Sequence, residues 1–216
     1  MLSAIILAAG KGSRLNLGYN KIFYEIKNKA IIEYSVDYFL NDDAFSEVIV
    51  VVNEKDRQRI KEIFKGKDIK IVLGGITRQE SVHNALKKTK GKYVLIHDGA
   101  RPYIDKKDIE NVKTTVIQNA CVLATSIKDS LAQVKFKKIH KYINRNDFVA
   151  LQTPQAFETS KILKAYNLAD MNNNIYSDDA SLYMQETQDD VIMLEGNELN
   201  LKLTTELDLK ILEEIL

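Results

Sequence analysis

The chain alternates between short apolar runs and segments whose apolar residues recur with helical spacing. The apolar runs are rich in Val and Ile, as is typical of buried strands, and lie at 4–7, 48–52, 69–73, 93–96 and 121–124. Between them, apolar side chains fall on one face of a helix in Ile31–Leu40, Ile60–Phe64 and Val82–Leu86. This alternation predicts an α/β fold with a mainly parallel sheet flanked by helices.

The pattern changes after residue 126. Residues 127–145 alternate in places and carry six Lys or Arg against one Asp, which predicts a projecting β-hairpin. Such a hairpin is either a solvated edge pair whose charges oppose aggregation or a functional arm, and the pattern leaves both open. Further on, we expect helices at Thr159–Ala169 and Asp178–Glu186, strands near Val191–Leu194 and Leu199–Leu203, and a closing helix from Thr204.

Length and charge narrow the class of protein. With 216 residues, 45% of them hydrophobic, the chain is long enough for one α/β domain over residues 1–216. A net charge of +1 argues against a nucleic-acid-binding protein, which usually carries a strong basic excess. The sequence has no signal-peptide pattern and no stretch near about 18 consecutive apolar residues, so we expect a cytoplasmic protein with no membrane partner. Cys121, the single cysteine, lies in an apolar run and is expected to be buried.

The loop after the first expected strand is the most informative segment. Leu7-Ala8-Ala9-Gly10-Lys11-Gly12-Ser13-Arg14 is followed by Lys21. Backbone amides at the glycines can surround phosphate oxygens while Arg14 and Lys21 neutralise them, so the loop predicts a polyphosphate site. The segment matches neither the dinucleotide-binding pattern nor the P-loop, and taken alone it also fits a flexible turn with surface cations.

Two more loops follow expected strands, as do Pro102 and Pro154. In an open parallel sheet, such loops meet outside the carboxyl ends of the strands. The loop at 74–81 runs into a helix start, where free amides and the Ser81 hydroxyl can bond a base or ribose. The alternatives are Ser81 as a cap-region residue and Arg78 as a surface charge. Asp98 follows the strand at 93–96 and suits Mg²⁺ bridging phosphate oxygens, while a simple turn former is the competing interpretation.

Other polar residues favour structural roles. His97 is expected to make a structural hydrogen bond at a strand end rather than to act as an acid or base. Asp178 and Asp179 begin an expected helix, where carboxylates cap the helix and complement its dipole. A metal-binding pair is the alternative. Asp208 follows Thr204-Thr205 in a second helix-start pattern and is also a candidate second metal ligand.

Eight segments occur in the order and approximate spacing found in the cytidylyltransferases of the isoprenoid pathway. They are LAAGKGSR with NK (7–21), GGITRQESV (74–82), HDGARP (97–102), KDS (128–130), NR (144–145), QTPQAF (152–157), SDDAS (177–181) and NLKLTTELDL (200–209). The chain resembles this family over nearly all of residues 1–213. The resemblance implies a Rossmann-like nucleotidyltransferase fold in which the hairpin at about 127–145 is a dimerisation arm.

The resemblance also implies a reaction and its partners. CMP would pass from CTP to 2-C-methyl-D-erythritol 4-phosphate, with Mg²⁺ as cofactor and pyrophosphate as second product, in a homodimer whose arms embrace the partner. By position, the cations on the phosphates are Arg14, Lys21 and Lys202. Asp98 would lie near the metal and the acceptor. The nucleotide would contact Ala8, Ala9, Gly10, Gly74, Gly75 and Ser81, and the acceptor would meet Ser177 together with Ser130 and Arg145 from the neighbouring arm.

A few positions depart from the family pattern. Ser130 and Ser177 stand where Thr is usual, which keeps each hydroxyl and removes a methyl group. Gly99 replaces a usual Ala. Tyr19-Asn20-Lys21 stands where Pro-Lys is commonest, so the chain lacks the ring that would fix the backbone before Lys21.

Related activities use similar loops. A ribitol 5-phosphate cytidylyltransferase shares most of them and tends to differ around the arm and the 177–181 segment, where this chain favours the methylerythritol enzymes. A non-catalytic nucleotide sensor need not keep Arg14, Lys21, Asp98 and Lys202 together. A sugar-1-phosphate uridylyltransferase of related fold fits the segments at 74–82 and 152–155 less well. We therefore expect a cytidylyltransferase that acts on methylerythritol phosphate.

Overall fold

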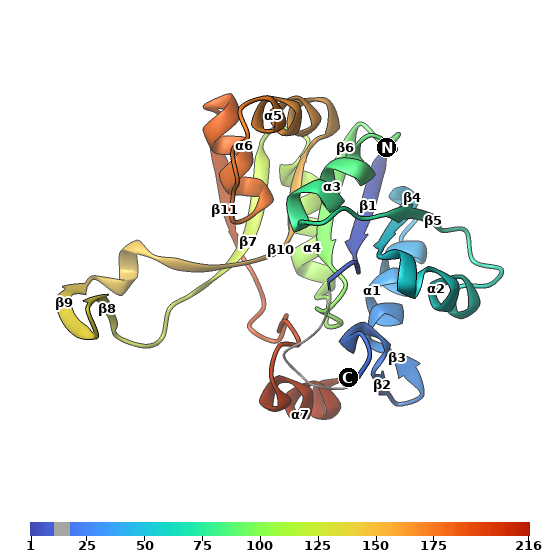
Figure 1. Ribbon diagram of the computed structural model, residues 1–216, viewed down its shortest axis with the longest axis horizontal. Coiled ribbons are helices and arrows are strands. Elements are labelled where there is room, and N and C mark those ends of the chain that lie inside the picture. The colour runs from blue at the N-terminus through green and yellow to red at the C-terminus, as the bar shows by residue number, and fades with distance from the viewer. Residues whose placement is uncertain (11–17) are drawn as a thin grey trace.

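The computed structural model describes residues 1–10 and 18–216. A seven-stranded sheet forms its centre, in the order β11-β7-β10-β6-β1-β4-β5 (Figure 1). These strands are β1 (Leu2–Leu7), β4 (Phe45–Val52), β5 (Lys70–Leu73), β6 (Tyr93–Asp98), β7 (Ala120–Ser126), β10 (Val149–Glu158) and β11 (Val191–Glu195). Only β10 runs antiparallel to its neighbours in this sheet. The predicted α/β fold with a mainly parallel sheet is confirmed.

Helices cover both faces of the sheet because side chains alternate along each strand. In β1, Ala4 and Ile6 pack into one apolar layer and Ile5 packs into the other. The first layer contains α1 (Ile31–Leu40), α2 (Arg57–Ile63), α4 (Lys106–Thr115) and α7 (Glu206–Ile215). The second contains α3 (Arg78–Leu86), α5 (Thr159–Met171) and α6 (Asp179–Thr187).

The strand order reverses beside β1. The chain passes from β1 to β4 and β5 on one side and then returns to β6 on the other, and open α/β sheets bind ligands at the carboxyl ends of strands at such a reversal. Backbone hydrogen bonds join the strand ends there, because Gly99 N donates to Leu7 O (2.9 Å) and Gly74 N donates to Val52 O (2.8 Å). The loops after β1, β5 and β6 therefore share one edge of the sheet, as predicted.

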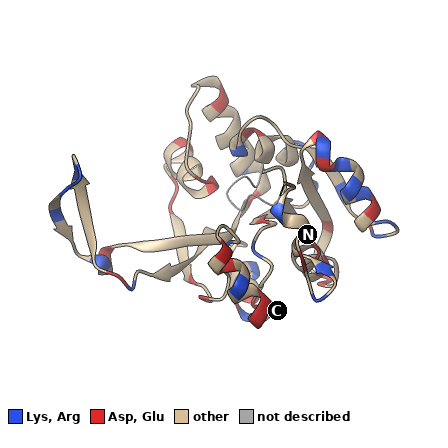
Figure 2. Ribbon diagram, turned by 60° about the horizontal axis from the view of Figure 1, so that its bottom comes forward, with Lys and Arg blue, Asp and Glu red and all other residues tan. Residues whose placement is uncertain are grey.

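Between β7 and β10 the chain leaves the sheet as a hairpin of β8 (Leu131–Lys135) and β9 (Lys138–Ile143), followed by the 3-10 turn η4 (Arg145–Asp147). The hairpin projects from the domain (Figure 1), and Figure 2 shows basic residues along it. Its turn residues Phe136 and Lys137 have φ values of 49° and 62°, the left-handed region used by tight hairpin turns. The expected projecting hairpin is confirmed.

Several local expectations are wrong. Leu199–Leu203 forms no strand; Leu203 N donates to Ala100 O (2.8 Å) in the loop after β6. Pro154 lies inside β10 rather than past a strand end, at a break in the pairing register between Leu151 and Gln155, where a missing N–H is tolerated. The predicted elements also omit β10 and α4.

The single cysteine lies in the core of the domain. Cys121 is buried, as expected, and its burial raises the pKa of the thiol to about 12. Among the described helices, none combines the length and apolar character needed to cross a lipid bilayer.

Candidate active site

Contact between the loops after β1 and β5 depends on a glycine. A Cβ atom at Gly74 would lie 2.7 Å from Ala9 Cβ and 2.7 Å from Ser81 Oγ, so a residue without a side chain lets the two loops meet. Gly75 N donates to Ser81 Oγ (3.0 Å), and Ser81 Oγ donates to Thr77 O (2.8 Å). The predicted nucleotide-binding residues of these loops are therefore brought together, with the Ser81 hydroxyl bonded within its own loop.

The end of β1 contributes two further candidates to this edge. Ala8 is buried, whereas Gly10 is exposed and has open space where a Cβ atom would lie. Arg14 lies outside the described residues, so its predicted place on the phosphates stays a prediction.

Asp98 ends β6 and pairs with Leu7 of β1. Its side chain is 10% exposed and faces three cationic groups, namely Lys202 Nζ at 2.7 Å, Arg78 Nε at 3.8 Å and Arg101 Nε at 3.9 Å. Burial by itself would raise the pKa of Asp98, but Arg78, Lys202 and Arg101 outweigh that effect and hold the pKa below its usual range. Asp98 is thus an ionised group that pairs with Lys202, so its role goes beyond forming the turn after β6.

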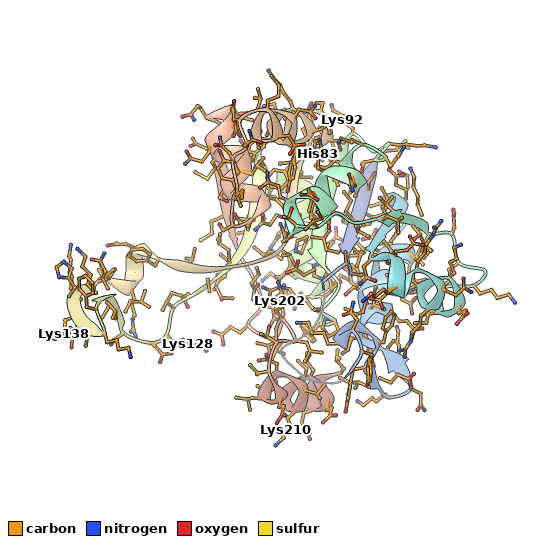
Figure 3. The ribbon with its side chains drawn as sticks, in the orientation of Figure 1. His83, Lys92, Lys128, Lys138, Lys202 and Lys210 are labelled. Atoms are coloured by element: carbon orange, nitrogen blue, oxygen red, sulfur yellow. The ribbon has the colours of Figure 1, made fainter. Side chains whose placement is uncertain are left out.

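The segment 200–203 brings two predicted phosphate-binding lysines to one place. Lys202 Nζ contacts Asp98, and Lys21 Nζ donates a hydrogen bond to the carbonyl oxygen of Leu203 (Figure 3 labels Lys202). The segment is anchored on both sides, because Arg101 Nη1 donates to Asn200 O (2.6 Å) and Asn200 Nδ2 donates to Thr153 O (2.8 Å). Lys21 is therefore bonded to the residue that follows Lys202, the lysine that contacts Asp98.

A buried ion pair that sequence reasoning missed adjoins this cluster. The Nη1 and Nη2 atoms of Arg78 donate to the two carboxylate oxygens of Asp179 (2.9 and 2.7 Å), and the Asp179 side chain is fully buried. Tyr166 Oη donates to the same carboxylate. Arg78 therefore joins the end of β6 to the start of α6, and its interpretation as a surface charge is wrong. The tandem Asp178-Asp179 was the sequence signal for this ion pair, because one carboxylate is enough to cap a helix and the second needs another partner.

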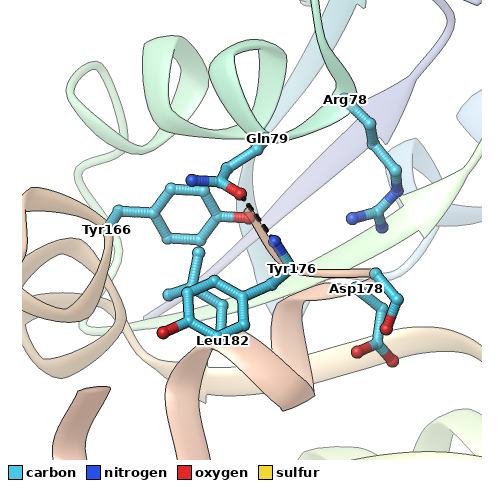
Figure 4. Close-up of a pocket in the computed structure, with 7 residues that line it drawn as sticks. Arg78, Gln79, Tyr166, Tyr176, Asp178 and Leu182 are labelled. Carbon is cyan, nitrogen blue, oxygen red and sulfur yellow. Dashed lines mark hydrogen bonds between the residues drawn. The ribbon is translucent and has the colours of Figure 1, made fainter. Parts of the chain in front are cut away.

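The start of α6 is fixed by Asp178 and Gln155. Asp178 Oδ1 accepts from Ser181 N (2.9 Å), which confirms the expected cap. Gln155 Nε2 donates to Asp178 Oδ2 (2.8 Å), and Gln155 Oε1 accepts from Ala180 N (2.8 Å). Ser177 lines a neighbouring cavity of about 10 Å³, room for roughly one water molecule, together with Arg78, Gln79, Tyr166, Tyr176, Asp178 and Leu182 (Figure 4).

A groove of about 430 Å³ links Lys202 with the stem of the hairpin. Lys128 lines it and pairs with Glu198, and Arg145 Nη1 donates to Lys128 O. Ser130 and Arg145 are exposed, and Figure 3 shows Lys128 on the hairpin, apart from Lys202. The structure therefore places Lys202 against Asp98 and Lys21 against Leu203, but it does not place Ser130 and Arg145 beside the Asp98 of their own chain.

His97 and Asp208 have structural roles. The ring nitrogens of His97 hydrogen-bond with Arg101 O (3.0 Å) and Thr153 Oγ1 (3.1 Å), and burial lowers the pKa of His97 to about 4. These hydrogen bonds confirm the expected structural role, and the lowered pKa keeps the imidazole neutral near pH 7. Asp208 Oδ2 accepts from Thr204 N (2.8 Å) and Thr205 N (2.7 Å), so Asp208 completes the capping box at the start of α7. Its alternative role as a second metal ligand stays a prediction. Within residues 1–10 and 18–216, no group of three His, Cys, Asp or Glu side chains is placed to hold a metal.

The sheet is doubly wound and its loops meet at the strand-order reversal. This arrangement is typical of the Rossmann-like class of nucleotide-binding folds. A family model described as 2-C-methyl-D-erythritol 4-phosphate cytidylyltransferase matches residues 2–216. The chain therefore belongs to the 2-C-methyl-D-erythritol 4-phosphate cytidylyltransferase family and is a nucleotidyltransferase enzyme, as its sequence motifs predict.

Individual relatives agree with the family model. A Clostridioides difficile protein of the same description is 37% identical over 223 residues, which cover 100% of this chain and 94% of that protein. A Halalkalibacterium halodurans protein of this description is 38% identical over 220 residues, which cover 99% of this chain and 96% of that protein. The crystal structure of 4-diphosphocytidyl-2C-methyl-D-erythritol synthase from Anaerococcus prevotii superposes with a TM-score of 0.88 at 27% identity, covering 99% of this chain and 95% of that one. The cytidylyltransferase from Francisella tularensis gives a TM-score of 0.86 at 26% identity, covering 100% and 99%.

Proposed function

We propose that this chain transfers CMP from CTP to 2-C-methyl-D-erythritol 4-phosphate in isoprenoid biosynthesis. An oxygen of the acceptor phosphate attacks the α-phosphorus, the bond from that phosphorus to the bridging β-phosphate oxygen breaks, and pyrophosphate leaves with the electron pair. A phosphate monoester is already a nucleophile near neutral pH, so no general base is needed and the rate comes from positioning and charge neutralisation. The observation that supports the proposal is that Lys21 and Lys202 meet in one segment, where Lys21 bonds to the Leu203 carbonyl and Lys202 contacts Asp98.

The nucleoside of CTP would lie along Ala8, Ala9 and Gly10 and over the 74–81 loop. Small side chains support this placement, because they let a flat base approach the backbone closely. The loop is also held in shape by its own side chains, since Ile76 N donates to Glu80 Oε2 (2.7 Å) and Gly75 N donates to Ser81 Oγ (3.0 Å). A loop ordered in advance loses little freedom when it binds a ligand.

Lys21 and Lys202, with Arg14, would neutralise charge that develops on the α-phosphate and on the leaving pyrophosphate. A well-placed cation in such a site contributes on the order of 3 kcal/mol to the transition state. Asp98 would hold Lys202 at 2.7 Å and accept hydrogen bonds from the acceptor hydroxyls.

Mg²⁺ is the metal we propose, with Asp98 as its protein ligand. Mg²⁺ commonly takes one or two carboxylates and fills its other positions with substrate phosphates and water. Asp98 offers the ionised carboxylate that such a site needs, because the surrounding cations hold its pKa below the usual range. The metal would share that carboxylate with Lys202. When bound, the metal would neutralise part of the triphosphate charge.

We further propose that the protein is a cytoplasmic homodimer formed by a single domain with its hairpin arm. Apolar side chains are exposed on the hairpin, with Val134, Phe136, Ile139 and Tyr142 between 59% and 97% accessible, and clustered apolar surface of this kind marks interaction sites. A second copy would cover these residues and bring Ser130 of the partner subunit and the partner's Arg145 toward Lys202. Ser177 would contact the acceptor from its own chain.

The test is pyrophosphate release by the purified protein with CTP, Mg²⁺ and separate acceptors. We expect kcat/KM for 2-C-methyl-D-erythritol 4-phosphate to exceed that for ribitol 5-phosphate by about a hundredfold or more, as expected when a buried site reads several hydroxyl groups. Preference for ribitol 5-phosphate would overturn the acceptor assignment, and preference for UTP over CTP would overturn the nucleotide. Nucleotide binding without pyrophosphate release under any of these conditions would indicate a sensor.

A further inference from the structure

Lys21 stands on a turn that is fastened through the residue before it. Asn20 is the N-cap of the 3-10 turn η2 (Lys21–Phe23) and is 7% exposed. Its Nδ2 atom donates to Asp56 Oδ2 (2.8 Å) and to Ala8 O (3.2 Å), while its Oδ1 atom accepts from Ile22 N (3.4 Å). One side chain thus joins the turn to the end of β1 and to the segment after β4.

Both anchor points of Asn20 are themselves fixed. Ala8 N donates to Val51 O (2.8 Å), which ties the Ala8 peptide to the sheet. Asp56 closes the 3-10 turn η3 (Glu54–Asp56), where Asn53 Nδ2 donates to Asp56 Oδ2 (2.7 Å) and Asp56 N donates to Asn53 Oδ1 (2.9 Å). The Lys21 turn is therefore bonded to groups that the domain already holds in place.

The backbone φ angle of Asn20 is close to the value that a proline ring imposes. Its φ is −67° and its ψ is 125°, and a proline ring fixes φ near −65°. An asparagine without partners visits many other backbone conformations and tolerates the left-handed region. Side-chain hydrogen bonds here supply the restraint that a ring would supply covalently.

We propose that Asn20 is a positioning residue for cytidylyl transfer, whose hydrogen bonds to Ala8 and Asp56 hold the Lys21 turn so that the ammonium lies beside Leu203. This inference rests on the role proposed above for Lys21. A displaced cation loses interactions with charge that develops only in the transition state, so kcat falls while KM for CTP changes little.

The test compares variants of the full-length protein in steady-state assays with CTP and 2-C-methyl-D-erythritol 4-phosphate, with circular dichroism and thermal unfolding to establish that each is folded. Asn20→Ala should lower kcat about tenfold or more and change KM for CTP by less than about threefold. Asn20→Pro should return kcat to within about threefold of the wild type, because the ring restores φ. Asn167→Ala is the matched control, since it also removes a side-chain amide that hydrogen-bonds to a buried group, His83 Nε2 (2.9 Å), but the bond joins α5 to α3 and does not involve Asn20, Ala8 or Asp56, and it should keep kcat within about twofold.

Three results would overturn the inference: kcat of Asn20→Ala within about twofold of the wild type, an equal loss in Asn167→Ala, or no recovery in Asn20→Pro. Should Asn20→Ala fail to fold, Asp56→Ala removes the same hydrogen bond from the other side, and an unchanged kcat there also overturns it. Lys21→Ala separates the two proposals. Normal turnover in Lys21→Ala contradicts the role of Lys21, whereas slow turnover in Lys21→Ala with normal turnover in Asn20→Ala contradicts only the positioning by Asn20.

Discussion

Replacing Arg78 with Met should destabilise the fold by about 3 kcal/mol. The Asp179 side chain is fully buried and accepts hydrogen bonds from Arg78 and Tyr166. Removing one partner of a buried ion pair leaves an uncompensated charge, which typically costs roughly 3–5 kcal/mol. The Arg78 side chain is 33% exposed, so water can reach the edge of the site and the loss should fall at the lower end of that range.

Urea unfolding followed by circular dichroism measures this loss directly. In a domain of this length, a change of 1 kcal/mol moves Tm by roughly 2–4 °C, so Arg78→Met should melt about 6–12 °C below the wild type. Arg57→Met is the control, because its ion pair with Glu54 spans 3.5 Å between side chains that are 44% and 68% exposed. That variant should lose less than about 1 kcal/mol.

A second substitution tests the cause of the loss. Asp179→Asn removes the buried charge, so the double variant Arg78→Met with Asp179→Asn should be more stable than Arg78→Met alone. The reasoning is refuted if Arg78→Met loses no more stability than Arg57→Met, or if the second substitution adds to the loss.

Two further results are expected. Acid should destabilise the protein through His97, because its pKa is near 6.5 in the unfolded chain and about 4 in the folded protein. Between these pH values the unfolded state binds more protons than the folded state. The free energy of unfolding should therefore fall by up to about 3 kcal/mol as the pH drops from 6.5 to 4. Urea unfolding at pH 7 and pH 4.5 should show a smaller acid-induced loss in His97→Gln, and an equal loss would mean that other groups are responsible. Arg145→Ala should raise KM for the acceptor far more than KM for CTP in steady-state kinetics, and equal effects on both constants would mean that the arm is only structural.

The sequence predicts most of the parallel sheet because burial on both faces demands continuous apolar runs. It fails at β10, where the buried residues Gln152, Thr153 and Gln155 are polar. Their side chains bond to loops and to the start of α6, as the contacts of Gln155 with Asp178 show, so no apolar periodicity marks the strand. Sequence reasoning fails at α4 as well, because Ile109 and Val112 are its only apolar residues and mark no clear helical face.

Site residues divide in the same way. Loop position after a strand predicts that Gly74, Ser81 and Asp98 lie on one edge of the sheet, because parallel topology alone places them there. The Arg78 and Asp179 ion pair depends on how α3 and α6 both pack with α5. The Leu203 carbonyl that meets Lys21 belongs to a loop without a periodic pattern. Such contacts follow from tertiary structure and leave little trace in local sequence.

Turnover by Lys21→Ala tests most directly whether converging cations drive the reaction. The measurement is kcat with saturating CTP and 2-C-methyl-D-erythritol 4-phosphate, on protein whose circular dichroism spectrum matches the wild type. Loss of a cation worth about 3 kcal/mol in the transition state predicts a fall in kcat of about a hundredfold or more. A folded Lys21→Ala enzyme with kcat within about threefold of the wild type would contradict the convergence of charge as the source of catalysis.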